Sequence, residues 1–192
     1  MAFLKNRNIA VLIAVAAIVL ATLFGVHRSL SSLSGDIERM FFDGVYLESE
    51  GYKQPSINSQ IERMSAAALD IASLFQNHPD LNAASEAVFE TRRELLNAES
   101  FSDKSRALTN MENAVVVLVS TVSRKADSSE RDFEAAGQHW RTFEGASSYI
   151  EDTLAPAYNS KVDSFYSQRS LIAALISGTA PEYFRWVAAS YG

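Results

Sequence analysis

Residues 9–26 read IAVLIAVAAIVLATLFGV and contain no charged side chain from end to end. At a rise of about 1.5 Å per residue, this run forms a helix of roughly 27 Å, close to the hydrocarbon thickness of a bilayer. Only Thr22 and Gly25 interrupt its aliphatic and aromatic side chains, and both residue types are tolerated in membrane spans. The run therefore predicts a transmembrane anchor over residues 9–26 that contacts membrane lipid.

The basic residues on either side of this run predict its orientation. Lys5, Arg7 and the terminal amine precede it, and His27 and Arg28 follow it, a bias that slightly favours a cytoplasmic N-terminus. We therefore expect residues 1–8 in the cytoplasm and an extracytoplasmic body in a single-pass cell-membrane protein. The alternative is a cleaved signal peptide. A retained signal anchor is favoured, because the run exceeds an apolar region of about 7–15 residues and no small-residue cleavage pattern follows it cleanly.

Composition excludes several classes of partner. The whole chain has a formal net charge of −6, and the part beyond Lys5 and Arg7 is more acidic still. An acidic body repels phosphate backbones, and its basic residues form no stripe, so no nucleic acid is expected as a partner. The absence of cysteine excludes disulfides and a lipid-modified cysteine. With only 4 Pro and 8 Gly, long uninterrupted helices are the expected backbone.

Beyond the anchor, residues 27–178 show the pattern of amphipathic helices joined by short connections. Apolar residues recur at spacings of three and four in four segments, which cover about residues 30–45, 56–98, 103–124 and 129–168. The first segment continues from the membrane span without a break, and a turn is expected at 51–55. These features predict an all-α fold, in which the transmembrane helix is followed by an antiparallel up-and-down four-helix bundle.

Three local signals refine this expectation. The second helix is expected to start near Ser56 or Ser59, and Ser59 followed by Glu62 fits a capping box there. Pro79 is compatible with a reversal or a kink, and a kink is favoured because no loop of useful length separates the two halves of that helix. A bend at Pro156 is expected to re-aim the end of the fourth helix.

Residues 179–192 form an aromatic C-terminal tail, in which Tyr183, Phe184 and Trp186 lie close together. The last helix of an up-and-down bundle ends at the pole where the first begins, which places residues 171–186 near the membrane. Aromatic rings favour the headgroup region there. An equally weighted alternative is that the tail folds back and caps the bundle. A true reversal at Pro79 would change the direction of the helices and remove the lipid interpretation.

No residue pattern indicates catalysis. The histidines, His27, His78 and His139, belong to no Glu-x-x-His or His-Glu-x-x-His pattern, so no metal ligand set is predicted. The sequence has no phosphate-binding glycine-rich loop, no Ca²⁺ loop and no nucleophile elbow. We therefore expect a protein that is not an enzyme, with no catalytic residue, no cofactor and no metal.

Four other residues have a structural and a functional interpretation. Trp140 and Phe143 could line a ligand pocket, but their place in the apolar stripe favours core packing. Tyr158 and Asn159 could bind a ligand, but a buried hydroxyl and amide that lock the helix register are favoured.

The C-terminal third resembles a known family. A set of residues in this third resembles the closing signature of LemA proteins. It consists of the pairs Tyr158-Asn159, Ile172-Ala173 and Tyr183-Phe184 and of Val162, Tyr166 and Pro181 between them. Phe143-Glu144-Gly145 is similar to that family's Leu-Glu-Gly step, and the order of membrane span, short helix and long helices agrees. The family elements expected near residues 54–64, at 147–150 and at Ser167 are absent, so the chain resembles a divergent member. The resemblance implies a membrane-tethered four-helix bundle without an established biochemical activity.

These observations predict a non-enzymatic interaction or scaffold module at the cell envelope. Its expected partners are membrane lipid, through the anchor, and a membrane or envelope protein. The alternative is an extracytoplasmic bundle that senses a ligand. Such a sensor would signal through a separate membrane partner, because residues 1–8 are too short for an output domain.

Overall fold

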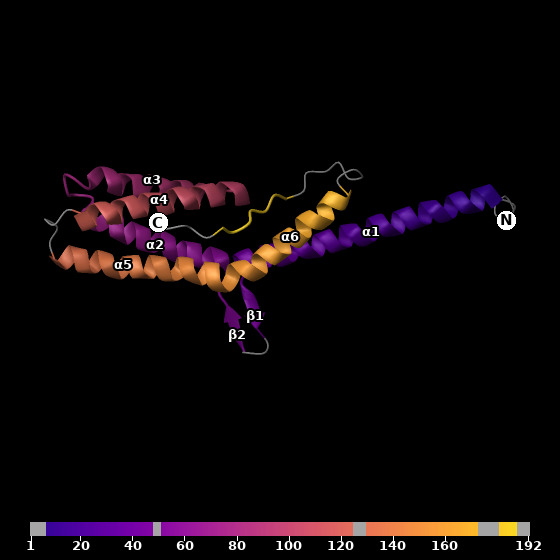
Figure 1. Cartoon of the computed structure of the whole chain (residues 1–192), viewed down its shortest axis with the longest axis horizontal. Coiled ribbons are helices and arrows are strands. Elements are labelled where there is room, and N and C mark those ends of the chain that lie inside the picture. Colours follow the sequence, from indigo (N-terminus) through magenta and orange to yellow (C-terminus); the bar gives the residue numbers. More distant parts are fainter. Residues whose placement is uncertain (1–6, 48–50, 125–129, 173–180, 188–192) are drawn as a thin grey trace.

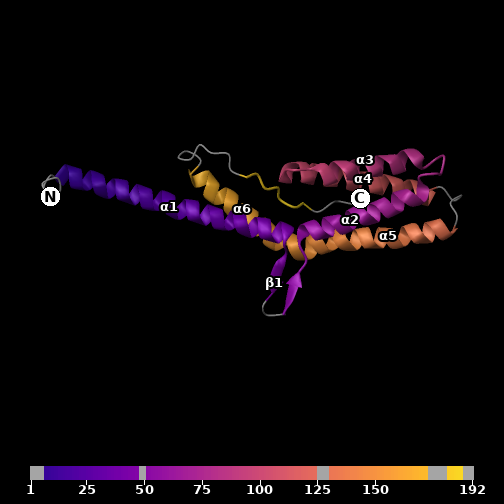
Figure 2. The ribbon, with the colours of Figure 1, turned by 180° about the vertical axis from the view of Figure 1, so that it is seen from behind.

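The computed structural model describes residues 7–47, 51–124, 130–172 and 181–187, and these residues are mostly helical. Figures 1 and 2 show an elongated molecule with one long helix extending from a group of packed helices. The helices are α1 (Arg7–Phe42), α2 (Ile57–Phe75), α3 (Asn82–Asn97), α4 (Phe101–Arg124), α5 (Glu130–Tyr149) and α6 (Ala155–Ile172). The helical class expected from the sequence is therefore confirmed.

Helix α1 is continuous over 36 residues, so the expected extension of the apolar run into the following segment is confirmed. Side chains of the apolar run are uncovered, with Leu12 and Phe24 exposed to 70% and 69%. Among the described helices, α1 is the one whose length and composition suffice to cross a membrane. Further along the same helix, Ile37 and Phe41 are fully buried. The helix therefore changes from an uncovered apolar rod into a part of the protein core.

A short antiparallel hairpin follows α1 and projects from the middle of the molecule (Figure 1). It consists of β1 (Val45–Leu47) and β2 (Tyr52–Gln54), where the sequence predicted only a turn. Gly44 lets the chain leave α1, because its φ is +78° and a Cβ there would collide with the carbonyl oxygen of Gln54. Strands this short have too little alternation to be recognised in the sequence.

Helix α2 begins at Ile57 with Ser56 as its N-cap. The Ser59 amide donates to Ser56 Oγ at 3.1 Å, and the Ser59 hydroxyl donates to the Ser56 carbonyl oxygen at 2.7 Å. The predicted capping box of Ser59 with Glu62 is therefore wrong. Glu62 instead accepts a hydrogen bond from Asn58 Nδ2 at 2.7 Å. Ser56 is the N-cap because it lies directly before the first helical residue, where a side-chain oxygen reaches the free backbone amides of the first turn.

The chain reverses between α2 and α3, so the predicted kink at Pro79 is wrong. The two helices pack against each other and run in opposite directions (Figures 1 and 2), which one kinked helix could not do. The Leu81 and Asn82 amides donate to the His78 carbonyl oxygen at 3.0 and 2.9 Å and close this tight connection. Pro79 has no amide hydrogen, which favours the end of one helix over its continuation.

Helices α5 and α6 form one continuous helical run with a bend between them (Figure 1), as the sequence predicted at Pro156. The bend lies at a π-helical turn, η2 (Ile150–Leu154). There the Ala155 amide donates to the carbonyl oxygen of Ile150, one residue further back than in an α-helix. Pro156 follows directly and lacks the amide that would bond the next carbonyl, so the proline and the π-turn together re-aim α6.

The helices pack in two groups. Helix α2 lies against α3 and α5, and α3 lies against α4, while α1 packs chiefly along α6. The segments expected at 30–45 and 56–98 therefore differ from the prediction, because the first lies on α6 and the second forms two helices. The core runs through both groups and includes Ile37, Met64, Ile71, Leu118, Phe143 and Tyr158.

Candidate functional site: the junction of α1, α6 and a C-terminal strap

Residues 181–187 fold back from the end of α6 along the molecule, as the extended yellow trace in Figure 1 shows. We call this segment the strap. Tyr183 and Trp186 are buried, with 4% and 7% of their surface exposed. The interpretation in which these rings lie in lipid is therefore wrong, and the alternative that the tail folds back is confirmed for the strap. The remainder of the tail, at 179–180 and 188–192, lies outside the described residues.

Two side chains of α6 hold the strap by its backbone. Asn159 Nδ2 donates to the Trp186 carbonyl oxygen at 2.9 Å, and the Trp186 amide donates to Asn159 Oδ1 at 2.8 Å. The Tyr166 hydroxyl donates to the Tyr183 carbonyl oxygen at 2.8 Å and accepts from the Tyr183 amide at 2.9 Å. Asn159 thus pairs with both the N–H and the C=O group of Trp186, and Tyr166 does the same for Tyr183.

The spacing of these contacts follows from elementary geometry. Asn159 and Tyr166 are seven residues apart on a helix, which corresponds to about 10.5 Å along its axis. Tyr183 and Trp186 are three residues apart on an extended chain, which spans about 10 Å. Since the earlier helix residue contacts the later strap residue, the strap runs antiparallel to α6.

The Tyr183 side chain connects the strap to α1. Its hydroxyl donates to Glu38 Oε1 at 2.9 Å and lies 2.6 Å from Ser34 Oγ. Helix α6 reaches the same helix directly, through Lys161 Nζ to Asp36 Oδ2 at 2.9 Å and Ser29 Oγ to Gln168 Oε1 at 2.8 Å. The contact at Ser29 places the end of α6 beside the end of the apolar run. The expectation that the last helix ends near the start of the body is therefore confirmed for α6.

Aromatic rings from α1, α4 and α6 line the surface beneath the strap. The Tyr183 ring lies between Phe101 and Phe165, at centroid distances of 5.0 and 5.2 Å. The Phe184 ring lies 6.0 Å from Phe41 and 6.1 Å from Tyr158. Edge-to-face and tilted rings at these distances add to the free energy of apolar burial. We call this surface the strap groove; it consists of Phe41, Phe101, Tyr158, Asn159, Phe165 and Tyr166.

Burial sets the protonation of the tyrosines in this region. Desolvation raises the pKa of Tyr158 well above its usual value, with nearby Tyr183 and Tyr166 adding to the effect. Desolvation is also the main cause that raises the pKa of Tyr183 to about 12; the Ser34 hydrogen bond lowers it and Glu38 raises it. Both hydroxyls therefore stay protonated at neutral pH. In this state each hydroxyl can donate a hydrogen bond.

Two buried donors at the junction have no hydrogen-bond partner among the described residues: the Tyr158 hydroxyl and Trp186 Nε1. A buried donor without an acceptor costs free energy that a water-exposed donor does not. One of these atoms belongs to the strap and the other to the groove beneath it. The fit of the strap is therefore good at its backbone and incomplete at these two side chains.

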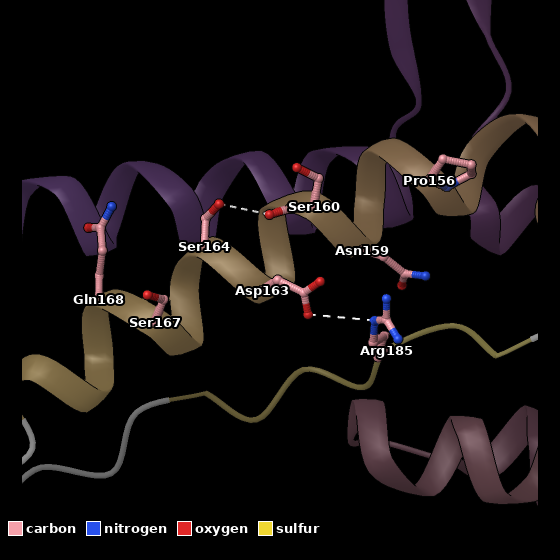
Figure 3. Close-up of a pocket in the computed structure, with 8 residues that line it drawn as sticks. All are labelled: Pro156, Asn159, Ser160, Asp163, Ser164, Ser167, Gln168 and Arg185. Atoms are coloured by element: carbon pink, nitrogen blue, oxygen red, sulfur yellow. Dashed lines mark hydrogen bonds and ion pairs between the residues drawn. The ribbon is translucent and has the colours of Figure 1, made fainter.

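An open polar pocket of about 580 Å³ lies beside the strap (Figure 3). It extends along α6 from Pro156 to Gln168, and Arg185 of the strap forms the opposite wall. Arg185 Nε lies 3.5 Å from Asp163 Oδ1, but both side chains are more than half exposed, so this ion pair contributes little to stability. The pocket presents hydroxyl and amide groups together with the Asp163–Arg185 charge pair.

A smaller apolar pocket of about 240 Å³ lies between α2, α4 and α5. Trp140 and Phe133 line it, and Trp140 stacks on fully buried Phe143 at 5.6 Å. The prediction of core packing is confirmed for Phe143. Trp140 is only half-buried and also lines the pocket, so a ligand-binding role for this residue stays a prediction.

The histidines of the described residues do not come together. His139 Nδ1 lies 3.3 Å from Asp70 Oδ2 of α2, whereas His78 lies in the connection after α2 and His27 at the end of the apolar run. Within the described part of the chain, no group of three or more metal-binding side chains forms.

The sequence indicated Tyr158, Asn159 and Tyr166 as residues of interest but did not predict which groups they contact. Tyr158 is buried as expected, while Asn159 binds the strap backbone and does not lock the helix register. The partners on α1, Ser34 and Glu38, carried no recognisable signal, because nothing in a single sequence pairs two residues that lie 145 positions or more apart. No family model, curated protein or solved structure matches this chain.

Proposed function

We propose that this protein is a LemA-like, membrane-anchored interaction or scaffold module of the cell envelope that performs no catalysis. The observation that carries this proposal is the single α1 helix, which is uncovered and apolar over residues 9–26 and enters the protein core at Ile37. A helix that continues from lipid into a core holds the body at a fixed distance from the bilayer. In the proposal, α2 to α5 act as an antiparallel four-helix bundle on this anchor.

Continuity of α1 also supports retention of the anchor in the mature protein. Residues 27–42 belong to the same helix and pack along α6, through Asp36 and Lys161 among others. The basic residues before the run favour a cytoplasmic N-terminus and an extracytoplasmic body. Separation of membrane and soluble fractions, followed by mass determination of the full-length protein, tests retention. A protein shortened near residue 26 and found in the soluble fraction would exclude the anchor.

Several of the residues that carry the LemA resemblance lie together at the junction. Asn159, Tyr166 and Tyr183 belong to that pattern, and all of them take part in holding the strap. Residues that resemble a family signature in the sequence thus form one connected unit at the junction. No biochemical activity follows from this resemblance.

Photo-crosslinking in intact membranes tests the interaction proposal. A photoreactive amino acid is placed singly at exposed positions of the body, such as Leu96 and Val117, and at Val187 of the strap. A dominant protein adduct, identified by mass spectrometry, would support an interaction module and name its partner. Lipid adducts alone, or none above background, would contradict it.

A second candidate function is a ligand-sensing bundle that signals through a separate membrane partner. The apolar pocket beside Trp140 favours it, because bundles that bind small molecules hold them between helices. Thermal unfolding of the full chain in the presence of small apolar molecules is the test. A reproducible shift that disappears in Trp140→Ala would support sensing, since ligands that bind only the folded state stabilise it. No shift with any compound would count against it.

A further inference from the structure

The strap is bound in the way that a separate peptide would be bound. It contacts the groove through its own backbone and through aromatic rings, and four hydrogen bonds join its backbone to Asn159 and Tyr166. We propose that the strap groove is a docking site for an extended segment of a partner protein, and that the strap is its built-in competitor. This inference rests on the proposed interaction function and names the surface that would carry it.

The groove selects an extended backbone first. Asn159 and Tyr166 each pair with one N–H and one C=O group, and their separation of about 10.5 Å fits residues three apart on an extended chain. A helical segment cannot offer these groups, because its N–H and C=O groups are already paired within the helix. The partner segment must therefore be extended where it lies on α6.

Side chains of the groove then set the pattern of the segment. The space between Phe101 and Phe165 takes an aromatic ring, and Ser34 and Glu38 at its end favour a hydroxyl, as in Tyr183. Trp186, three positions after Tyr183, contributes a large buried ring. Arg185, directly before it, is a cation that faces Asp163. The preferred ligand is therefore an extended segment with tyrosine first, a basic residue third and a large aromatic residue fourth.

The strap can be displaced because its own fit is incomplete. Within the described part of the chain, neither the Tyr158 hydroxyl nor Trp186 Nε1 has an acceptor while the strap is bound, and both regain water when it leaves. A segment that brings an acceptor to Tyr158 gains an interaction that the strap lacks. The strap has the advantage of its tether, which raises its local concentration to the order of millimolar. A free segment therefore competes well only when it fits better or the strap is weakened.

Peptide binding to the full-length chain in lipid nanodiscs tests the proposal. The probe is a fluorescent peptide with the sequence of residues 181–187, PEYFRWV, and the protein carries Tyr183→Ala and Trp186→Ala together to free the groove. We expect the peptide to bind this variant at least tenfold more tightly than the unaltered chain. A peptide with alanine at the same two positions serves as the control and should not bind. No binding to the variant, or equal binding to both proteins, would overturn the proposal.

Trypsin cleavage after Arg185 provides a measurement on a chain whose strap is unaltered. The Arg185–Trp186 bond is protected in the bound strap, because the Trp186 amide is held by Asn159. In Asn159→Ala we expect cleavage at this bond to accelerate at least tenfold, with the neighbouring Ser160→Ala as control. Cleavage at exposed Arg106 should stay constant and so report an intact fold. Equal cleavage after Arg185 in all three proteins would show that the strap is not held as proposed.

The two proposals can fail separately. A protein adduct on the body in the crosslinking experiment, together with absent peptide binding, would place the interaction surface elsewhere than the groove. Peptide binding without any protein adduct in membranes would leave the groove as an intramolecular device. In that case the proposed scaffold function would fall.

Discussion

The Tyr183 hydroxyl donates a 2.9 Å hydrogen bond to Glu38 and so joins the C-terminal strap to the helix that contains the apolar run. The two residues lie 145 positions apart. Around this bond, α1, α4, α6 and the strap contribute aromatic rings to one cluster. We therefore expect a change in the strap to alter the stability of the whole junction, α1 included.

Tyr183→Phe should weaken strap binding without disturbing the aromatic packing. The ring stays, and the hydrogen bonds to Glu38 and Ser34 are lost. Because Glu38 is exposed and can be hydrated, no buried charge is left behind, and we expect the free energy of unfolding to fall by about 1–2 kcal/mol. Urea unfolding of both proteins in the same detergent measures the difference. A loss above that of Tyr183→Leu, which also removes the ring, would contradict this account.

The stability of the junction should fall between about pH 10 and pH 12. Burial, the largest cause, raises the pKa of Tyr183 to about 12, whereas the unfolded chain titrates near the ordinary value of 10.0. Across this interval the unfolded state loses a proton that the folded state keeps, so rising pH favours unfolding. Below pH 10 this residue contributes no pH dependence. Unfolding measured from pH 8 to 12 should show a smaller decline in Tyr183→Phe, and identical curves for both proteins would refute the assignment.

Gly44→Ala should be destabilising well beyond an ordinary glycine substitution. The φ of +78° disfavours any L side chain, and the new Cβ would collide with backbone at Gln54. We expect a loss of about 2–4 kcal/mol, since strain and steric overlap add. Gly51→Ala is the matched control, because its φ is also positive but its Cβ would meet open space. Thermal unfolding compares them, and similar losses for both would show that the contact with Gln54 is unimportant.

Ile18→Arg should impair membrane integration. The residue lies near the middle of the apolar run and is 66% exposed, so no part of the described protein shields it. An arginine at the centre of a membrane helix costs about 3 kcal/mol on insertion scales. Ser32→Arg, on the exposed part of α1 beyond the run, is the control and should integrate normally. Carbonate extraction of membranes measures integration, and full retention of Ile18→Arg would argue that α1 does not cross the bilayer.

Local features of the fold can be predicted from the sequence. The uncharged run at 9–26, the continuation of α1 and the bend near Pro156 depend on residues within a few helical turns of one another. The direction of the chain after Pro79 cannot be predicted in this way, because a proline ends or kinks a helix equally well by local chemistry. Packing of α3 on α2 and α4 decides for the reversal. The hairpin at 45–54 is equally hidden, because three residues per strand show no pattern.

By itself, the sequence determined that α1 is apolar enough to cross a membrane and that the rest is helical, since composition and periodicity are properties of the local chain. It also placed Asn159, Tyr166 and Tyr183 in the pattern that resembles LemA proteins. Only the tertiary structure decided that Asn159 pairs with a backbone 27 residues away and that Tyr183 reaches α1. When a side chain bonds a backbone group, the sequence does not show which residue supplies that group. Every residue except proline carries the same backbone N–H and C=O. Such contacts arise only when the packed helices bring the two segments to the right distance.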